Sequence, residues 1–242
     1  MKIVKKLIRG IVVAFFASTI LAVIVLRFVP VFFTPLMFIR LAQQHQQGRE
    51  LMLCHTWVPL ERMSPSMPVA VIASEDAKFL QHHGFDFEAI EHAAKRNVEQ
   101  PERRKLGAST ITQQTAKNVF LWPGRSWVRK GFEAYFTVLI ELFWSKQRIM
   151  EVYLNSIEMG DGIYGAEAVA REHFGCTAEH LSRSQCALIA ATLPNPRRFS
   201  SKHPSNYMLK RQARIEREMK FVPAFPREGT DPKNPTTKKT KE

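Results

Sequence analysis

The sequence has few residues that could form a covalent or metal-held framework. Its three cysteines, Cys54, Cys176 and Cys186, are odd in number and far apart, and no CxxC pair is present. The pattern therefore supports neither a disulfide framework nor a cysteine zinc site, and three structural thiols are expected. No HExxH pattern is present either, so a zinc site built on that motif is not expected.

Acidic residues are also scarce. The 242 residues include 35 Lys and Arg but only 22 Asp and Glu, which gives a formal net charge of +13. Such an excess predicts attraction to an anionic partner: nucleic acid, phospholipid headgroups or a phosphorylated substrate. The sign of the charge does not choose among these three, but the N-terminal segment does.

Charged residues are missing from residues 11–26, which are almost wholly apolar and follow a basic start. A membrane-spanning helix needs about 20 such residues, and a span from about Leu7 to Val29 would be followed by helix-breaking Pro30 and Pro35. A cleaved signal peptide is the alternative, but no clear A-x-A site follows and the apolar region continues too far. We expect one uncleaved anchor with a cytoplasmic N-terminus and the rest of the chain outside. A nucleic-acid partner is then not expected.

The chain shows no convincing run of alternating strands and no internal repeat, so a mainly α fold is predicted. We divide it into a basic start and anchor (1–40), a connector (41–66), a globular domain (67–222) and a basic, disordered tail (223–242). An apolar helix with carboxylates near its end is expected to stop at Gly84. The segment 99–105 is expected to be a mobile loop, and the 160–165 sequence GDGIYG to be a loop.

Further helices follow from caps and apolar spacing. We expect them over 87–98, around 132–143, after Ser145, over 167–174, before Pro194 and, as a basic amphipathic helix, over 206–222.

The stretch 107–133 combines a glycine and small hydroxyl residues with amides, cations and one carboxylate. Its polar members at helical spacing are Gln113, Gln114, Lys117, Asn118, Arg125, Arg129, Lys130 and Glu133. Arg offers forked donors and Lys a point charge, a combination that suits a phosphate. The alternative is a solvated helix face with an Arg129–Glu133 ion pair.

Two carboxylates, Glu75 and Glu133, accompany these cations. Paired carboxylates are typical of glycosyl chemistry, in which one of them removes a proton from a hydroxyl group or water. Hydrolysis of a plain glycoside needs no phosphate-binding cations, whereas a diphosphate leaving group does. The combination therefore favours glycosyl transfer from a diphosphate donor, provided that Glu75 and Lys117 share one cavity.

Four segments occur in an order and at intervals that point to a known family. They are SEDAKFLQHHGFD (74–86), GASTITQQTAKN (107–118), RKGFE (129–133) and SKQRIMEVYLNSIEMGDGIYG (145–165). This series, within about Trp57–Phe199, resembles the motifs of the peptidoglycan glycosyltransferase family. The short chain has one anchor and no transpeptidase domain, and so is similar to the monofunctional biosynthetic branch.

The resemblance implies a lysozyme-like, mainly α catalytic domain with a head lobe and a smaller membrane-associated jaw lobe, preceded by one transmembrane helix. It implies that lipid II is polymerised into β-1,4-linked glycan strands on the outer face of the cytoplasmic (inner) membrane, with release of undecaprenyl diphosphate. In this reading Glu75 is the base that deprotonates the acceptor 4-hydroxyl. Glu133 is the second catalytic carboxylate, on the donor side.

The remaining site residues are also assigned through the resemblance. The donor diphosphate is expected to contact Lys117, Arg125, Arg129 and Lys130. The polar lining is expected to comprise Ser109, Thr110, Gln113, Gln114 and Asn118, with Asp76 and Phe79 shaping the first motif. His82 is interpreted as a structural, hydrogen-bonding residue. A divalent cation, Mg or Mn, is expected without a dedicated protein cage.

The expected partners are lipid II, the growing lipid-linked glycan strand, the membrane and other cell-wall synthesis proteins. Two other functions compete with this one: a lysozyme-like hydrolase of finished peptidoglycan, and a non-catalytic membrane scaffold for wall synthesis. The cation cluster argues against the hydrolase because a glycan polymer carries no diphosphate. A scaffold would need none of these carboxylates and cations.

Overall fold

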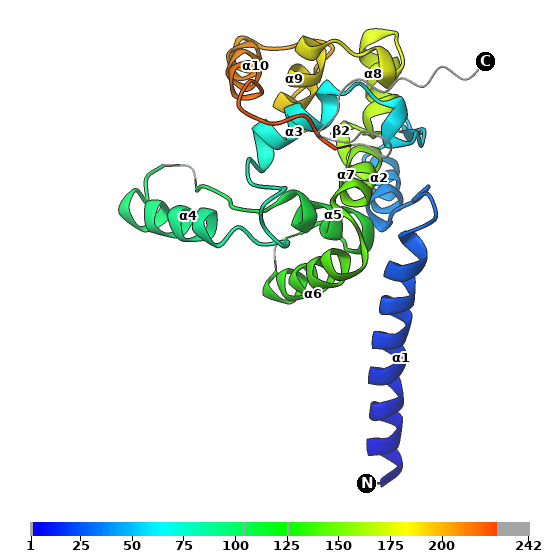
Figure 1. Cartoon of the computed structure of the whole chain (residues 1–242). Helices are drawn as coiled ribbons and strands as arrows, with labels where there is room; N and C mark the ends of the chain where they lie inside the picture. Colours follow the sequence, from blue (N-terminus) through cyan, green and yellow to red (C-terminus); the bar gives the residue numbers. More distant parts are fainter. Residues whose placement is uncertain (1, 104, 125, 227–242) are drawn as a thin grey trace, which may run out of the picture.

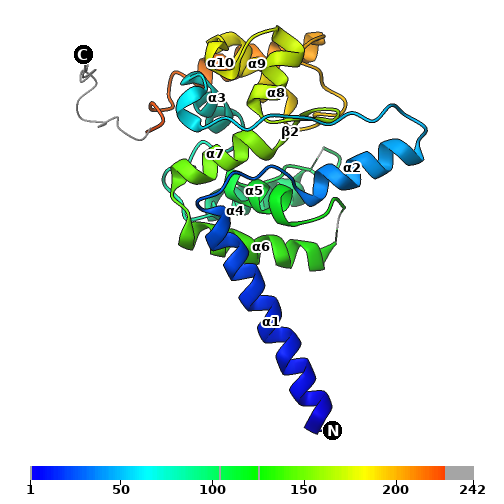
Figure 2. The same ribbon diagram turned by 90° about the vertical axis from the view of Figure 1, so that its right-hand side faces the viewer.

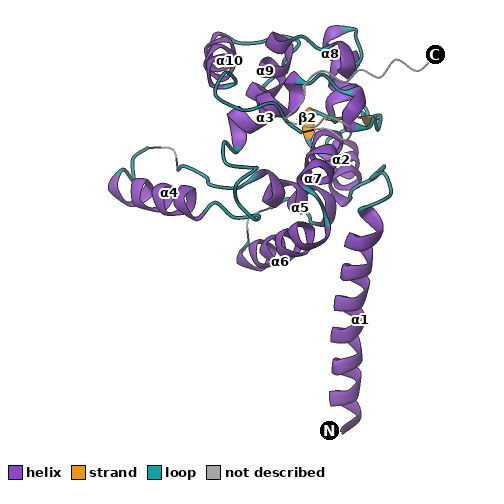
Figure 3. Ribbon diagram, viewed as in Figure 1, coloured by secondary structure: helices purple, strands orange, loops and turns teal. Residues whose placement is uncertain are grey.

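The computed structural model describes residues 2–226 except 104 and 125, and within them the fold is mainly helical (Figure 1; Figure 3). The α-helices are α1 (Lys2–Leu26), α2 (Pro35–Gln46), α3 (Ser66–Glu75), α4 (Phe87–Glu99), α5 (Ile111–Phe120), α6 (Trp127–Phe143), α7 (Lys146–Ser156), α8 (Ala166–Phe174), α9 (Arg183–Thr192) and α10 (Asn206–Glu218). Two short 3₁₀ helices, Leu60–Arg62 and Ala178–His180, complete the helical elements. The prediction of a mainly α fold is confirmed.

Helix α1 is a 25-residue apolar helix that extends away from the rest of the molecule (Figure 1; Figure 2). At about 1.5 Å per residue it is long enough to cross a bilayer, and most of its surface is exposed. Its second half packs against α6, where Phe15 lies beside Phe132 and the Thr19 and Tyr135 hydroxyls are 2.8 Å apart. The helix is consistent with a single-pass membrane anchor.

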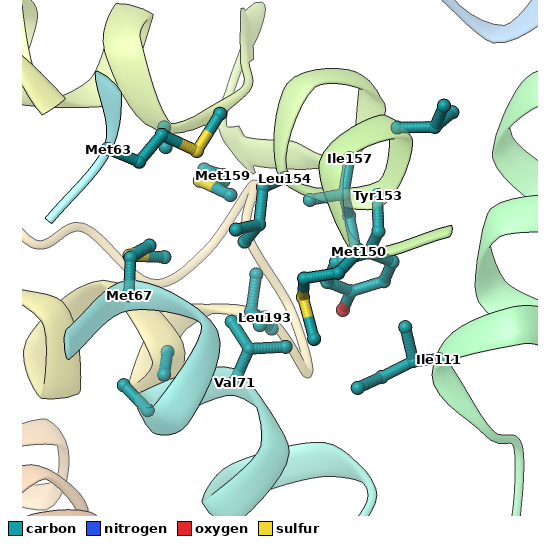
Figure 4. Close-up of a cluster of buried hydrophobic side chains, with 14 of the residues drawn as sticks. Met63, Met67, Val71, Ile111, Met150, Tyr153, Leu154, Ile157, Met159 and Leu193 are labelled. Carbon is teal, nitrogen blue, oxygen red and sulfur yellow. The ribbon is translucent and has the colours of Figure 1, made fainter. Parts of the chain in front are cut away.

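The remaining helices form two groups that share one hydrophobic core. Helices α3, α9 and α10 pack together, and α5 packs with α6 and α7. Between them, side chains such as Val71 of α3, Ile111 of α5 and Met150 of α7 gather in one buried cluster (Figure 4). Helix α4 projects away from both groups (Figure 1; Figure 2). The two groups therefore face each other across a packed centre.

Three short strands form a small sheet in the order β1–β3–β2. Strand β1 (Cys54–His55) runs parallel to β3 (Ile163–Tyr164), and β2 (Glu158–Gly160) runs antiparallel to β3. The prediction of a loop over 160–165 is therefore wrong in part, because its Asp-Gly turn joins β2 to β3 as a hairpin. Gly162 has φ +73°, and a Cβ there would lie 2.5 Å from the carbonyl oxygen of Met52.

Helix α3 ends at Glu75, nine residues before Gly84, so the expected stop at Gly84 is wrong. The chain leaves the helix at Asp76, which has φ −161° and ψ 76°. The Asp76 carboxylate accepts a hydrogen bond from the backbone N–H of Ile111 at 2.9 Å, and this tertiary contact holds the turn. As a result, Glu75 is the last residue of its helix.

The segments on either side of the expected domain are part of the fold. The segment 41–66, expected to be a connector, contains the end of α2 and strand β1, and its Val58 is held by hydrogen bonds to the Asn155 side chain. At the other end, the buried ring of Phe225 stacks on Phe79 at 6.3 Å. Residues 227–242, expected to belong to a disordered tail, lie outside the described residues.

Two glycines test how close backbone packing stabilises the fold. A Cβ on Gly165 (φ +83°) would lie 2.6 Å from the carbonyl oxygen of Asn155, whereas Gly175 (φ +64°) has open space around it. We expect Gly165→Ala to lower the free energy of unfolding by about 3 kcal/mol, because strain and overpacking combine. Gly175→Ala should cost about 1 kcal/mol, from backbone strain alone. Denaturant unfolding of the full chain in detergent measures both, and equal losses would contradict the packing argument.

Candidate active site

Six of the predicted site residues line two adjoining pockets: Glu75, Ser109, Gln114, Lys117, Asn118 and Arg129. The first, of about 360 Å³, is lined by α2, α5 and the start of α6, and includes Lys117 and Arg129. The second, of about 460 Å³, lies between α3, α5 and α10 and includes Glu75 and Ser109. The expectation that Glu75 and Lys117 share one cavity is wrong in that form. The two pockets meet at Gln114 and Pro194, which line both, so the site is a groove with two halves.

Glu75 presents its carboxylate at the boundary between these halves. Its side chain is 13% exposed, and it accepts hydrogen bonds from Ser74 Oγ at 3.0 Å and Gln114 Nε2 at 3.1 Å. Arg211 of α10 lies 3.5 Å from the same carboxylate. Burial raises the pKa of Glu75, and the hydrogen bonds and the charges of Arg211 and Lys117 oppose that rise. A carboxylate with a raised pKa is well suited to accept a proton near neutral pH.

The amide of Gln114 is itself held in place. The hydroxyl of Tyr153, fully buried on α7, donates to Gln114 Oε1 at 3.0 Å. Burial also raises the pKa of Tyr153 well above its usual value, so the hydroxyl stays protonated and remains a donor. Because Oε1 accepts from Tyr153, the Nε2 group of Gln114 is directed at Glu75. Tyr153 therefore positions the donor that contacts the carboxylate.

Asp76 and His82 form the support beneath Glu75. The backbone N–H of Gly84 donates to His82 Nδ1 at 3.1 Å, which leaves Nε2 to donate to Asp76 at 2.9 Å. The structural interpretation of His82 is thus confirmed. Phe79 is fully buried under Lys146, whose ammonium lies 4.6 Å from the ring centroid. Asp76 and Phe79 both lie outside the pocket linings and shape the first motif from behind.

Lys117 contributes its ammonium group to the first pocket of the groove. Within the described residues it has neither a hydrogen-bond nor an ion-pair partner, and it is accessible from the first pocket. Partial desolvation by the surrounding protein lowers its pKa, Arg129 and Lys130 lower it further, and Glu133 and Glu75 oppose them. An unpaired ammonium group in a groove is available to bind an anion.

Glu133 lies behind the cations and lines neither pocket. It is 3% exposed and pairs with Arg129 at 2.8 Å and with Lys130, both on the preceding turn of α6. The ion pair between Arg129 and Glu133, expected for a solvated helix face, is thus formed by a buried carboxylate. The geometry supports an orienting role for Glu133, since it fixes the side chain of Arg129, which does reach the first pocket.

The other predicted contacts divide between the groove and the fold. Thr110 and Gln113 form a reciprocal capping box at the start of α5, and both are buried, so their polar groups are used by the helix. Both had been assigned to the polar lining, but neither lines a pocket. Ser109 lines the second pocket and Asn118 the first, where Asn118 also donates to the backbone carbonyl of Gln114 at 2.7 Å. Arg125 lies outside the described residues.

Several groove residues were not predicted from the sequence, among them Arg40, Glu158, Tyr207 and Arg211. Arg211 and Tyr207 share one face of the basic amphipathic helix α10, and this i, i+4 spacing was the only signal for them. Arg40 and Glu158 line the first pocket, although Arg40 had been assigned to the end of the anchor segment. Their contact joins elements more than 100 residues apart, which spacing in the sequence does not reveal.

A protein-held metal does not fit this groove. Among the described residues, no three His, Cys, Asp or Glu side chains gather as a ligand set. The first pocket instead presents Arg40, Lys117 and Arg129, with Glu158 as its one carboxylate among the described residues. Cations of this kind would repel a divalent ion and attract an anion.

The comparisons with known proteins agree with this chemistry. A family model described as Transglycosylase matches residues 44–220. The chain is 61% identical over 244 residues to a protein of Bacteroides thetaiotaomicron named biosynthetic peptidoglycan transglycosylase, covering 98% of each chain. Proteins with the same name from Bdellovibrio bacteriovorus and Caulobacter vibrioides are 54% and 51% identical, and the matches cover 92% and 88% of this chain and 88% and 92% of theirs.

The role of Arg211 in the electrostatics of Glu75 can be measured directly. We expect Arg211→Gln to raise the pKa of the Glu75 carboxyl above its wild-type value, because a positive charge that stabilises the ionised form is removed. Carboxyl-carbon NMR titration of the labelled full chain, with Glu75→Gln to assign the signal, measures the shift. Arg214→Gln on the exposed side of α10 is the matched control. An unchanged or lowered pKa in Arg211→Gln would contradict this account.

Proposed function

The chain belongs to the transglycosylase family and is a peptidoglycan glycosyltransferase that polymerises glycan strands, and on that premise we propose that it uses lipid II as its substrate, with Glu75 as the base. One observation carries the proposal. A buried carboxylate stands where two pockets meet, and the cations Lys117 and Arg129 line the pocket on the far side of Gln114. The second pocket then holds the acceptor sugar and the first holds the donor diphosphate.

The reaction begins at the acceptor hydroxyl. Glu75 takes the proton of the 4-hydroxyl of the acceptor N-acetylglucosamine as its oxygen attacks the anomeric carbon of the donor N-acetylmuramic acid. Attack from the face opposite the leaving group inverts the configuration and forms the β-1,4 bond. Gln114 and Ser74 hold the carboxylate in place, and the opposing effects of burial and Arg211 set its basicity.

The leaving group determines the role of the first pocket. As the bond from the anomeric carbon to the phosphate oxygen breaks, its electron pair stays on undecaprenyl diphosphate. Lys117 and Arg129 stabilise that developing charge, and Lys130 and Arg125 are the further donor-side residues that we propose. Glu133 acts through Arg129, whose guanidinium it orients at 2.8 Å. Ser109 and Asn118 supply polar contacts to the two sugars.

The membrane supplies both substrates. We assign the group of α3, α9 and α10 to the head of a lysozyme-like fold, and α4 together with α6, which packs against the anchor, to the smaller jaw. The outer surface of α6 carries Trp127, Val128, Val138 and Leu142, all exposed, which supports contact of the jaw with lipid. The proposed orientation has the N-terminus in the cytoplasm and the groove at the outer face of the inner membrane, and four basic residues at the start of α1 support it.

The proposed partners are the growing lipid-linked strand, the lipid surface and other cell-wall synthesis proteins. A divalent cation, Mg or Mn, is proposed only as a companion of the diphosphate, since the residues of the groove do not form a site for it. No step above depends on it. The cationic groove also argues against a hydrolase, because a finished glycan brings no anionic leaving group.

The proposed role of Glu75 is tested by a substitution that keeps the shape of its side chain. We expect Glu75→Gln to lower polymerisation of lipid II by about 10³-fold, because an amide cannot accept the acceptor proton. Purified full chain, lipid II and detergent are assayed by gel separation of the glycan products, with donor binding measured in parallel. Binding should persist. A variant that still makes polymer at the wild-type rate would remove Glu75 from this role.

The diphosphate site is tested at Lys117. We expect Lys117→Ala to lower kcat by about 10²-fold, since a preorganised charge at the leaving group is lost. Lys220→Ala, at an exposed position after α10, is the control and should match the wild type. Steady-state kinetics on lipid II separate kcat from KM. If neither changes in Lys117→Ala, the assignment of this residue is wrong.

A further inference from the structure

Arg40 enters the groove from an element outside the predicted catalytic domain. It lies on α2, the first helix after the anchor, which packs against α5. With Leu36 it forms a wall of the first pocket, where Lys117 and Arg129 form others. The pocket therefore receives cations from three separate helices.

The guanidinium of Arg40 is incompletely satisfied. Its NH1 group donates to Gln43 at 2.7 Å, but its Nε is buried and, within the described residues, has no hydrogen-bond partner. The nearest acid is Glu158, whose Oε2 lies 3.5 Å from that Nε, in ion-pair range but without a hydrogen bond. Arg40 is 19% exposed, so donors that point into the pocket remain available to a ligand.

Glu158 is left unsatisfied in the same way. Its side chain is 6% exposed, and its Oε1 is buried without a hydrogen-bond partner among the described residues. Burial raises the pKa of Glu158, and Asp161 adds to the rise, whereas Arg40, Arg197 and a hydrogen bond from the Gly162 backbone oppose it. Burying two loosely paired charges costs desolvation free energy for both side chains, and the hydrogen bonds between them recover little of that cost. The arrangement is therefore poorly explained as a structural salt bridge alone.

We propose that Arg40 is a further substrate-binding residue, which binds the diphosphate of the donor through its guanidinium and exchanges Glu158 for a phosphate oxygen. The inference rests on the proposed function, because it takes the first pocket as the donor site. A forked guanidinium binds a phosphate with two parallel hydrogen bonds, which the 3.5 Å contact with Glu158 does not supply. Glu158 is then the countercharge that Arg40 faces before the donor arrives.

The charge of the pocket agrees with this ligand. Its described lining contains three cations, Arg40, Lys117 and Arg129, and the single carboxylate of Glu158. A diphosphate diester carries two negative charges, which match the excess of two positive ones. A monophosphate ester also carries about −1.5 to −2 charge at neutral pH, but on a single phosphate that offers fewer oxygens to the three cations, so Arg40 should favour the diphosphate over the monophosphate.

The experiment measures binding of farnesyl diphosphate and farnesyl monophosphate to the full chain in detergent by calorimetry. We expect Arg40→Gln to weaken diphosphate binding about tenfold, as for the loss of a charge-assisted hydrogen bond, and monophosphate binding less. Arg40→Lys keeps the charge but not the forked guanidinium, so its affinity for the diphosphate should lie between those of the wild type and Arg40→Gln. Arg214→Gln, which breaks an exposed arginine–glutamate pair on α10, is the control and should bind as the wild type does.

The double variant Arg40→Gln/Glu158→Gln separates a ligand contact from a structural pair. If Arg40 only neutralises Glu158, removing both charges restores binding, and the proposal is overturned. If Arg40 contacts phosphate, binding stays weak. Wild-type affinity in Arg40→Gln, or no diphosphate binding by the wild type, also overturns it. A parallel lipid II assay isolates the proposed function, because a wild-type chain that makes no polymer rejects that function whatever Arg40 does.

Discussion

The hydrogen bond from the backbone N–H of Ile111 to the Asp76 carboxylate is the contact on which the groove depends. It ends α3 at Glu75 and fixes the first turn of α5. Helix α5 then presents Gln114 and Lys117 at its next two turns, one toward Glu75 and the other toward the cations. The carboxylate of Asp76, which lines neither pocket, therefore sets the distance between Glu75 and the cations of the first pocket.

Burial and charge act against each other at Glu75 and Lys117, on the two sides of this groove. Desolvation raises the pKa of Glu75 and lowers that of Lys117, while each group's charge opposes the shift of the other. Glu133 is buried behind the first pocket, where its ion pair holds the side chain of Arg129.

Much of the fold could be predicted from the sequence because caps and apolar spacing are local signals. Ser145, Ser182 and Asp86 cap the helices expected after them. The end of α3 was missed because it depends on Ile111, 35 residues away. Thr110 and Gln113 were misassigned since a capping box and a ligand contact need the same residue types. Arg40 and Arg211 were missed because they reach the groove by tertiary packing alone.

The end of the anchor helix is fixed to the catalytic body by side chains of α6 and α7. Trp144 donates to the backbone carbonyl of Val23 at 2.8 Å, and Arg148 donates to that of Leu26 at 2.9 Å, so two carbonyls in the last turn of the helix are bound by the domain. These bonds fix the direction in which the helix axis leaves the domain. In the proposed membrane arrangement, that angle sets the tilt of the groove relative to the lipid surface. It thereby also sets the side from which a lipid-linked sugar would enter the groove.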